Sequence, residues 1–243
     1  MSEFFEIFAP SMRHLREQRD LEKVLVVDDA KGGSGPRPLD LDSGSVVLRL
    51  QASATPAEPT QPPAPYAAVM DPLIPEPDTK DWTVVEHEPC AECGFDATRI
   101  DPHELSALVL AETAAWTAIL ARPDAAERPS PQVWSPLEYA CHVRDVILVF
   151  TQRLGMMLTQ PKPRFSNWDQ DATAVADRYW EQSPAAVADQ LDAAARTMST
   201  LWSEIRDDEW GRKGTRSDGA EFTVASLGTY LMHELHHHLA DAR

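Results

Sequence analysis

The sequence predicts an all-α protein, a four-helix bundle that follows an N-terminal extension. Two observations lead to this fold class. Three helix starts after residue 100 share one capping device, and apolar residues after them recur at intervals of three and four. Four long helices with connections longer than a hairpin turn form a bundle of ordinary domain size.

The shared capping device is a polar side chain followed by proline at the first helical position. It occurs at Asp101-Pro102, Ser135-Pro136 and Ser183-Pro184. Glu104 and Glu138 add an acidic residue at the third position, which predicts two capping boxes. We therefore expect helices to begin near residues 102, 136 and 184.

Apolar spacing predicts how far these helices run. The first ends near residue 121, the second near 159 before two prolines, and the third near 205, while a fourth begins at Thr223 and continues toward the C-terminus. A short helix is expected at residues 172–180. The predicted inward positions are Val143, Ile147, Phe150, Leu154, Met157, Val187, Leu191, Ala194, Met198, Leu201, Trp202, Val224, Leu227, Leu231 and Leu235. Core volume is expected from Trp116, Trp134, Trp202 and Trp210.

The N-terminal part of the chain differs in composition from the rest. Residues 1–55 predict an appendage, with a short helix and two short strands around a glycine-rich turn. Residues 56–80 predict an extended linker, because eight prolines lie between Pro56 and Pro77. The helix bundle is then expected over residues 81–243.

Composition restricts the partners and the compartment. A formal net charge of −17 argues against nucleic acid or an anionic membrane as a partner. Three cysteines cannot build a disulfide framework, so we expect a reducing, cytoplasmic compartment. The sequence contains neither an apolar run long enough to span a membrane nor a signal peptide pattern.

A histidine cluster near the C-terminus predicts metal binding. Four of the eight histidines lie within residues 233–238, and His233 and His237, four apart, share one face of a helix. The same residues spell H-E-x-x-H, the signature of zinc proteases in which the glutamate is the general base. The protease interpretation is disfavoured, because only six residues follow His237 and we expect no substrate-binding edge strand in residues 101–243.

His142 is the candidate third ligand. It lies near the start of the second helix, with Val146 and Val149 one and two turns on, at the border of the apolar stripe. A lone histidine there is commonly an ordinary buried residue. With an i, i+4 pair on another inward-facing helix, however, three imidazoles can converge inside a bundle.

These residues carry a family resemblance. The run W-S-P-L-E-Y-A-C-H-V-R-D at 134–145, followed by His233-x-x-x-His237, resembles the DinB-like (YfiT-like) metal-binding four-helix bundles, which include mycothiol- and bacillithiol-dependent S-transferases. The resemblance implies an up-down-down-up topology and the metal ligands His142, His233 and His237. C-A-E-C-G-F-D at 90–96 and N-W-D-Q-D at 167–171 resemble an actinobacterial subgroup. Residues 4–10, 13–17 and 39–50 resemble a short actinobacterial family of unknown function, which implies no activity.

Three neutral imidazoles would leave open coordination positions on a divalent ion, as in catalytic sites. Bound thiol would lose its proton there, and bound water could become a nucleophile. We therefore expect a thiol S-transferase that uses zinc, or else nickel, iron or manganese, with mycothiol and an electrophile as small-molecule partners. A non-catalytic metal-binding or stress-response module is the alternative, and a metallohydrolase is a more remote one. The sequence does not determine the oligomeric state and is compatible with a homodimer.

Cys90 and Cys93 form half of a zinc knuckle. The remaining two ligands would have to come from elsewhere, and the candidates in the sequence are Cys141 and His87. A redox role would need a βαβ context, which the flanking residues do not provide. A purely structural role for the two cysteines is the other interpretation.

Several polar residues have two interpretations. Glu138 is expected first as a capping residue and second as an acid or base near the metal. Asn167 and Asp169 would cap the short helix or orient a ligand. Glu234 is expected on a neighbouring face, paired with solvent or Arg243. The remaining expectations are an exposed or outer-sphere position for His236 and His238, and a core position for Cys141.

Overall fold

A computed structural model of the chain describes residue 80 and residues 82–243, and it confirms the predicted helix bundle. The predictions for residues 1–79, an appendage and a linker, lie outside the described residues. The helices of the bundle are α2 (Leu105–Thr113), the short α3 (Trp116–Leu120), α4 (Pro136–Thr159), α6 (Pro184–Ser203) and α7 (Val224–Asp241). None of the helices in the described part of the chain is long and apolar enough to cross a membrane.

The first predicted helix is divided into α2 and α3, after the 3-10 turn η3 (Pro102–Glu104). Thr113, the last residue of α2, is buried and its hydroxyl donates to the carbonyl of Val109 at 2.7 Å. Such back-bonding competes with the regular helical ladder and commonly bends a helix. Both pieces pack along α6, so together they serve as one side of the bundle.

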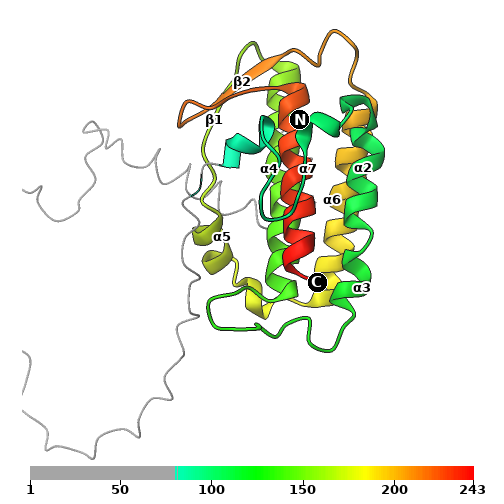
Figure 1. Ribbon diagram of the computed structural model, residues 1–243, viewed down its shortest axis with the longest axis vertical. Coiled ribbons are helices and arrows are strands. Elements are labelled where there is room, and N and C mark those ends of the chain that lie inside the picture. Colours follow the sequence, from blue (N-terminus) through cyan, green and yellow to red (C-terminus); the bar gives the residue numbers. More distant parts are fainter. Residues whose placement is uncertain (1–79, 81) are drawn as a thin grey trace, which may run out of the picture. The chain divides into compact units, whose positions relative to one another are not determined.

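The bundle has the up-down-down-up topology that the resemblance implied. α4 and α6 run in one direction, while α2 and α7 run in the other (Figure 1). α2 and α4 each pack against both α6 and α7. The connection over residues 160–183 returns the chain along the bundle, which allows α4 and α6 to be parallel.

The long connections contain short elements: β1 (Arg164–Phe165), α5 (Gln170–Ala176), η4 (Tyr179–Glu181), β2 (Lys213–Arg216) and β3 (Glu221–Thr223). β2 pairs with β1 in parallel and with β3 in antiparallel orientation. The sequence patterns did not predict these strands. These strands have two to four residues, too few to produce a detectable alternation of apolar and polar residues.

The predicted inward positions form the core. Every one of them is buried except Leu201, which is partly buried and packs against the core. Trp116, Trp134 and Trp202 are buried as expected, and Trp210 packs at the edge. Trp202 and Trp210 stack face to face, with ring centroids 5.9 Å apart.

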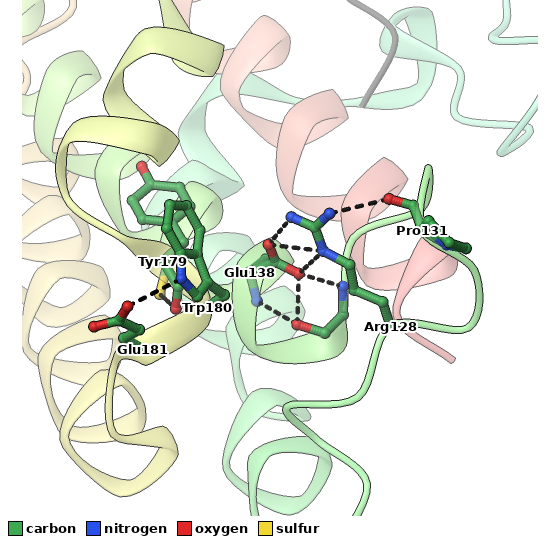
Figure 2. A network of polar contacts seen from close by, with 8 residues as sticks. Arg128, Pro131, Glu138, Tyr179, Trp180 and Glu181 are labelled. Carbon is green, nitrogen blue, oxygen red and sulfur yellow. Dashed lines mark hydrogen bonds and ion pairs between the residues drawn. The ribbon is translucent and has the colours of Figure 1, made fainter. Parts of the chain in front are cut away.

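The start of α4 is fixed by the predicted capping box. Ser135 caps the helix, its hydroxyl accepting from the backbone N–H of Glu138, while the Glu138 carboxylate accepts from the backbone N–H of Ser135 at 2.9 Å. Arg128 donates to the same carboxylate (Figure 2). Glu138 is 1% exposed, so its charge is compensated within the protein. This network confirms Glu138 as a capping residue and orients the turn that carries His142.

The other predicted capping box, at Asp101 and Glu104, is wrong. Asp101 does cap η3, but its side chain accepts from the backbone N–H of His103. A reciprocal box instead forms at Thr223 and Ser226, where a serine at the third position replaces the expected acidic residue. Thr223 is thereby confirmed as the N-cap of α7.

The segment before the bundle packs on α7. It consists of η1 (Trp82–Glu86), the turn that contains Cys90 and Cys93, and η2 (Ala97–Arg99). Both η1 and η2 contact α7. Val85 and Phe95 anchor the segment in the hydrophobic core.

Candidate metal centre

The C-terminal half of α7 presents two pairs of side chains of the types that bind metals, on adjoining faces. His233 and His237 are four residues apart, and so are Glu234 and His238. The ring centroids of His233 and His237 lie 5.1 Å apart. The prediction that these two histidines share a helix face is therefore confirmed.

Glu234 and His238 face His142 on α4. The Oε2 atom of Glu234 lies 3.7 Å from Nε2 of His142 and 3.5 Å from Nε2 of His238. One ligand atom from each of the three residues falls within 4.8 Å of the other two. Two histidines and one carboxylate are a ligand set that zinc and non-haem iron sites use.

The environment of His142 fits a metal ligand. Both ring nitrogens are buried and have no hydrogen-bond partner, an arrangement that normally costs free energy. The distances from Glu234 are too long for hydrogen bonds but match two nitrogen or oxygen ligands around one ion, which lie about 3.4 Å apart in tetrahedral geometry. A divalent ion at this position would satisfy the otherwise unpaired imidazole.

Aromatic rings enclose the His142 imidazole. Trp168 stacks on the His142 ring, with ring centroids 5.4 Å apart and an angle of 11° between the ring planes. Trp134 contacts the same ring in a tilted arrangement, with ring centroids 5.5 Å apart. Tyr139 stacks on His238 at 5.6 Å. These contacts restrict the rotation of both ligand rings and limit the access of water from their sides.

Asp241 orients the His238 ring from the outer side. Its Oδ2 atom lies 3.0 Å from Nδ1 of His238, so Nδ1 donates to the carboxylate and Nε2 is directed toward Glu234. Metal-binding histidines in proteins commonly have such an outer carboxylate, which fixes the tautomer.

Charge in the metal-free group is concentrated on Glu234 and His238. Burial alone would raise the pKa of Glu234, but its contacts with His142 and His238 hold that pKa well below its ordinary value. Burial opposes protonation of His238, yet Asp241 and Glu234 raise its pKa to about 9. Burial lowers the pKa of His142, which is therefore neutral and ready to act as a ligand.

A second group of ligand-type residues lies beside the first. Cys90, Cys93, His233 and His237 each offer one atom within 4.8 Å of the others. The predicted partners of the two cysteines, Cys141 and His87, are not in this group. Cys141 is a core residue, as expected, and His87 is exposed on the preceding turn.

The three histidines predicted from the sequence are divided between these groups. His142 lies with Glu234 and His238, while His233 and His237 lie with the cysteines. Glu234 does lie on a neighbouring face, as expected, but the expected pairing with solvent or Arg243 is wrong, because Glu234 contacts His142 and His238. The spacing of Glu234 and His238 equals that of His233 and His237, so the sequence did contain a signal for this second pair.

The other polar residues take mainly local roles. Asp169 caps α5 by accepting from the backbone N–H of Ala172, and the backbone N–H of Asn167 donates to the hydroxyl of Ser217. His236 lies partly exposed beside Glu112, at 3.4 Å, away from both groups. Trp168, between Asn167 and Asp169, is the member of this motif that contacts His142.

Comparison with known proteins assigns the bundle. Residues 105–242, more than half of the chain, match the model of the DinB superfamily. The chain belongs to this superfamily. Residues 7–48 match a second model, a family of unknown function named DUF6191.

The fold of the DinB domain resembles a solved structure, YfiT from Bacillus subtilis. The TM-score is 0.53 with 18% sequence identity, over 58% of this chain and 83% of YfiT. YfiT is described as a probable metal-dependent hydrolase with an unusual four-helix bundle topology. At this identity the likeness shows the fold alone. No match was found among curated proteins.

Proposed function

We propose that this DinB protein is a metal-dependent enzyme that transfers a low-molecular-weight thiol to an electrophile at His142, Glu234 and His238. The observation that supports the proposal is the convergence of three ligand atoms from α4 and α7 on one point. His142 reaches that point with two buried ring nitrogens that have no hydrogen-bond partner.

Three protein ligands leave coordination positions open, which is typical of catalytic rather than structural sites. A divalent ion held there would act as a Lewis acid that lowers the pKa of a bound thiol or water. Zinc suits this ligand set, and iron, nickel or manganese would also be accepted by imidazole and carboxylate.

The surroundings of the site favour a thiol over water as the nucleophile. The carboxylates around it are already engaged: Asp241 by His238, Asp145 by Arg144 and Tyr179, and Glu138 by the N-terminus of α4. Because these three carboxylates already have hydrogen-bond or ion-pair partners, none of them is well placed to accept a proton from a bound water. A thiol, with an ordinary pKa of about 8.5 against about 15.7 for water, depends less on such a base.

The aromatic side chains determine how a substrate could approach. Trp168 and Trp134 both contact His142, and Tyr139 contacts His238. These rings limit the free volume around the ligand atoms and lower the local dielectric constant. A compact apolar electrophile would be favoured over a peptide, because flat aromatic walls bury apolar surface but offer few hydrogen bonds.

The test is thiol consumption by metal-loaded protein. We expect loss of a small thiol, such as mycothiol, in the presence of monochlorobimane, and we expect this loss to stop when the metal is removed. Glu234→Gln and His142→Ala should each reduce turnover at least 100-fold. His236→Ala is the matched control on α7 and should retain wild-type turnover, because His236 lies away from the site.

Three results would contradict the proposal. Thiol loss that does not exceed the metal-free background across a panel of thiols would indicate a non-catalytic metal-binding module. Loss of the electrophile without thiol consumption would identify water as the nucleophile and the protein as a hydrolase. Full turnover in Glu234→Gln would remove this carboxylate from the site and favour the tri-histidine set His142, His233 and His237 predicted from the sequence.

A further inference from the structure

The DinB domain contains a second cluster of ligand-type residues that the proposed transferase does not use. Cys90 and Cys93 come from the segment before the bundle, whereas His233 and His237 come from α7. Four ligand atoms from two segments about 140 residues apart in sequence lie within 4.8 Å of one another. Cysteine and histidine in equal number form a common tetrahedral zinc set.

Backbone hydrogen bonds fix the shape of the cysteine turn. The backbone N–H of Gly94 donates to the carbonyl of Cys90 at 2.9 Å, and the N–H of Cys90 donates to the carbonyl of Phe95 at 2.8 Å. Gly94 has a φ of +75°, in a region that favours glycine. The turn brings both thiols within 4.8 Å of each other and of the two histidines.

The distances fit a tetrahedral ion. Sγ of Cys90 lies 3.7 Å from Nδ1 of His237. A thiolate sulfur and an imidazole nitrogen bound to one zinc ion lie about 3.6 Å apart. His233 completes the set, because both of its ring nitrogens are buried without a hydrogen-bond partner.

The outer contacts of His237 assign its tautomer. Nε2 faces the carboxylates of Glu92 and Asp241, each at 3.6 Å. A proton on Nε2 is favoured by these two charges, which leaves Nδ1, the atom beside Cys90, free to bind a metal. Trp82 covers the imidazoles of His233 and His237, with ring centroids 5.2 and 4.9 Å away.

Charge balance suits this buried position. Binding of one zinc ion converts two thiols to thiolates and releases two protons to solvent, so the ion and its four ligands carry no net charge. A neutral assembly is tolerated in a buried site much better than a charged one.

We propose that Cys90, Cys93, His233 and His237 form a closed, structural zinc site that fastens residues 82–100 to α7 beside the open site. This zinc site would form whether or not the open site transfers thiols. Its four ligands leave no open position, so it would stabilise the fold rather than bind substrate. Because His237 and His238 are consecutive, this zinc site would also hold in place the part of α7 that carries Glu234 and His238.

The first test uses cobalt as a spectroscopic substitute for zinc in the full-length protein. We expect reduced, metal-free protein to bind two equivalents, one of which produces thiolate-to-cobalt charge-transfer absorption and intense tetrahedral visible bands. His142→Ala should lose one equivalent and keep the charge-transfer absorption, since it affects only the open site. Binding without charge-transfer absorption in the wild-type protein would overturn the proposal, whatever the result for the transferase.

The second test uses variants of the cysteines. Cys90→Ser with Cys93→Ser should lose one equivalent and all charge-transfer absorption, whereas the core variant Cys141→Ala should keep both. Retention of the absorption in the double variant would contradict the assignment. If the double variant does not fold, thiol labelling of the wild-type protein provides the readout. Zinc should protect two thiols from labelling, and these thiols should become reactive when a chelator is added. If zinc does not change the labelling, the cysteines do not bind it and the proposed zinc site is wrong.

Discussion

Oδ2 of Asp241 lies 3.0 Å from Nδ1 of His238 and 3.6 Å from Nε2 of His237. One carboxylate thus orients a histidine in each of the two ligand groups. Asp241 is the last residue of α7, so its position depends on the helix being formed up to its end. The two groups are therefore connected through a residue that belongs to neither.

We predict that Asp241→Asn lowers the affinity of the open site for zinc about 10- to 100-fold, because an amide does not hold the His238 tautomer as a carboxylate does. Competition with a chromogenic chelator measures this change. Glu112→Gln is the matched control, since Glu112 contacts His236 and should leave both metal affinities unchanged. An unaltered affinity in Asp241→Asn would show that this carboxylate does not orient the ligand.

The variants His237→Ala and His238→Ala separate the two assignments of the ligands. The geometry predicts that His238→Ala loses metal-dependent turnover and keeps the cobalt–thiolate absorption, and that His237→Ala loses that absorption. If His142, His233 and His237 bind the catalytic metal instead, His237→Ala should lose turnover and His238→Ala should keep it. Loss of turnover in His237→Ala, with full turnover in His238→Ala, would therefore support His142, His233 and His237.

The sequence predicted the bundle well because the signals for it are local. Capping residues such as Ser135 and Thr223, and apolar spacing of three and four, depend only on neighbours within a few turns. The pairing of β1 with β2 was missed, since the partners Arg164 and Thr215 are far apart in sequence and each strand is very short.

The sequence identified some of the residues that lie in the two clusters of ligand-type side chains. His142, His233 and His237 were all recognised as candidate ligands, but four-residue spacing on α7 allows two pairs, and the sequence does not state which pair faces α4. That choice depends on the rotation of α7 about its axis, which the packing of Leu231 and Leu235 in the core determines. The approach of the cysteine turn to His233 is likewise a tertiary contact without a local signal.

We predict that Glu138→Gln destabilises the fold by about 2–4 kcal/mol, because it removes from a buried, paired network the negative charge that faces the Arg128 guanidinium. Chemical denaturation measures the difference. Glu104→Gln is the control at another helix start, where the glutamate is exposed and the cap does not depend on it. Equal effects of the two variants would show that the network at the start of α4 has no special role.

Gly228 on α7 tests how closely the helices approach one another. A methyl group there would overlap Leu105 on α2 and would lie 2.9 Å from Cη2 of Trp202 on α6. We therefore predict that Gly228→Ala destabilises the bundle by about 1–3 kcal/mol, as overpacking does in other cores. Gly155→Ala on α4 is the matched control, since a methyl group there meets no atom within 4 Å. It should instead stabilise the helix by about 0.5–1 kcal/mol, because alanine loses less backbone entropy than glycine. Thermal or urea unfolding of both variants measures the two effects, and stabilisation by Gly228→Ala would mean that α2, α6 and α7 pack less tightly than their side chains indicate.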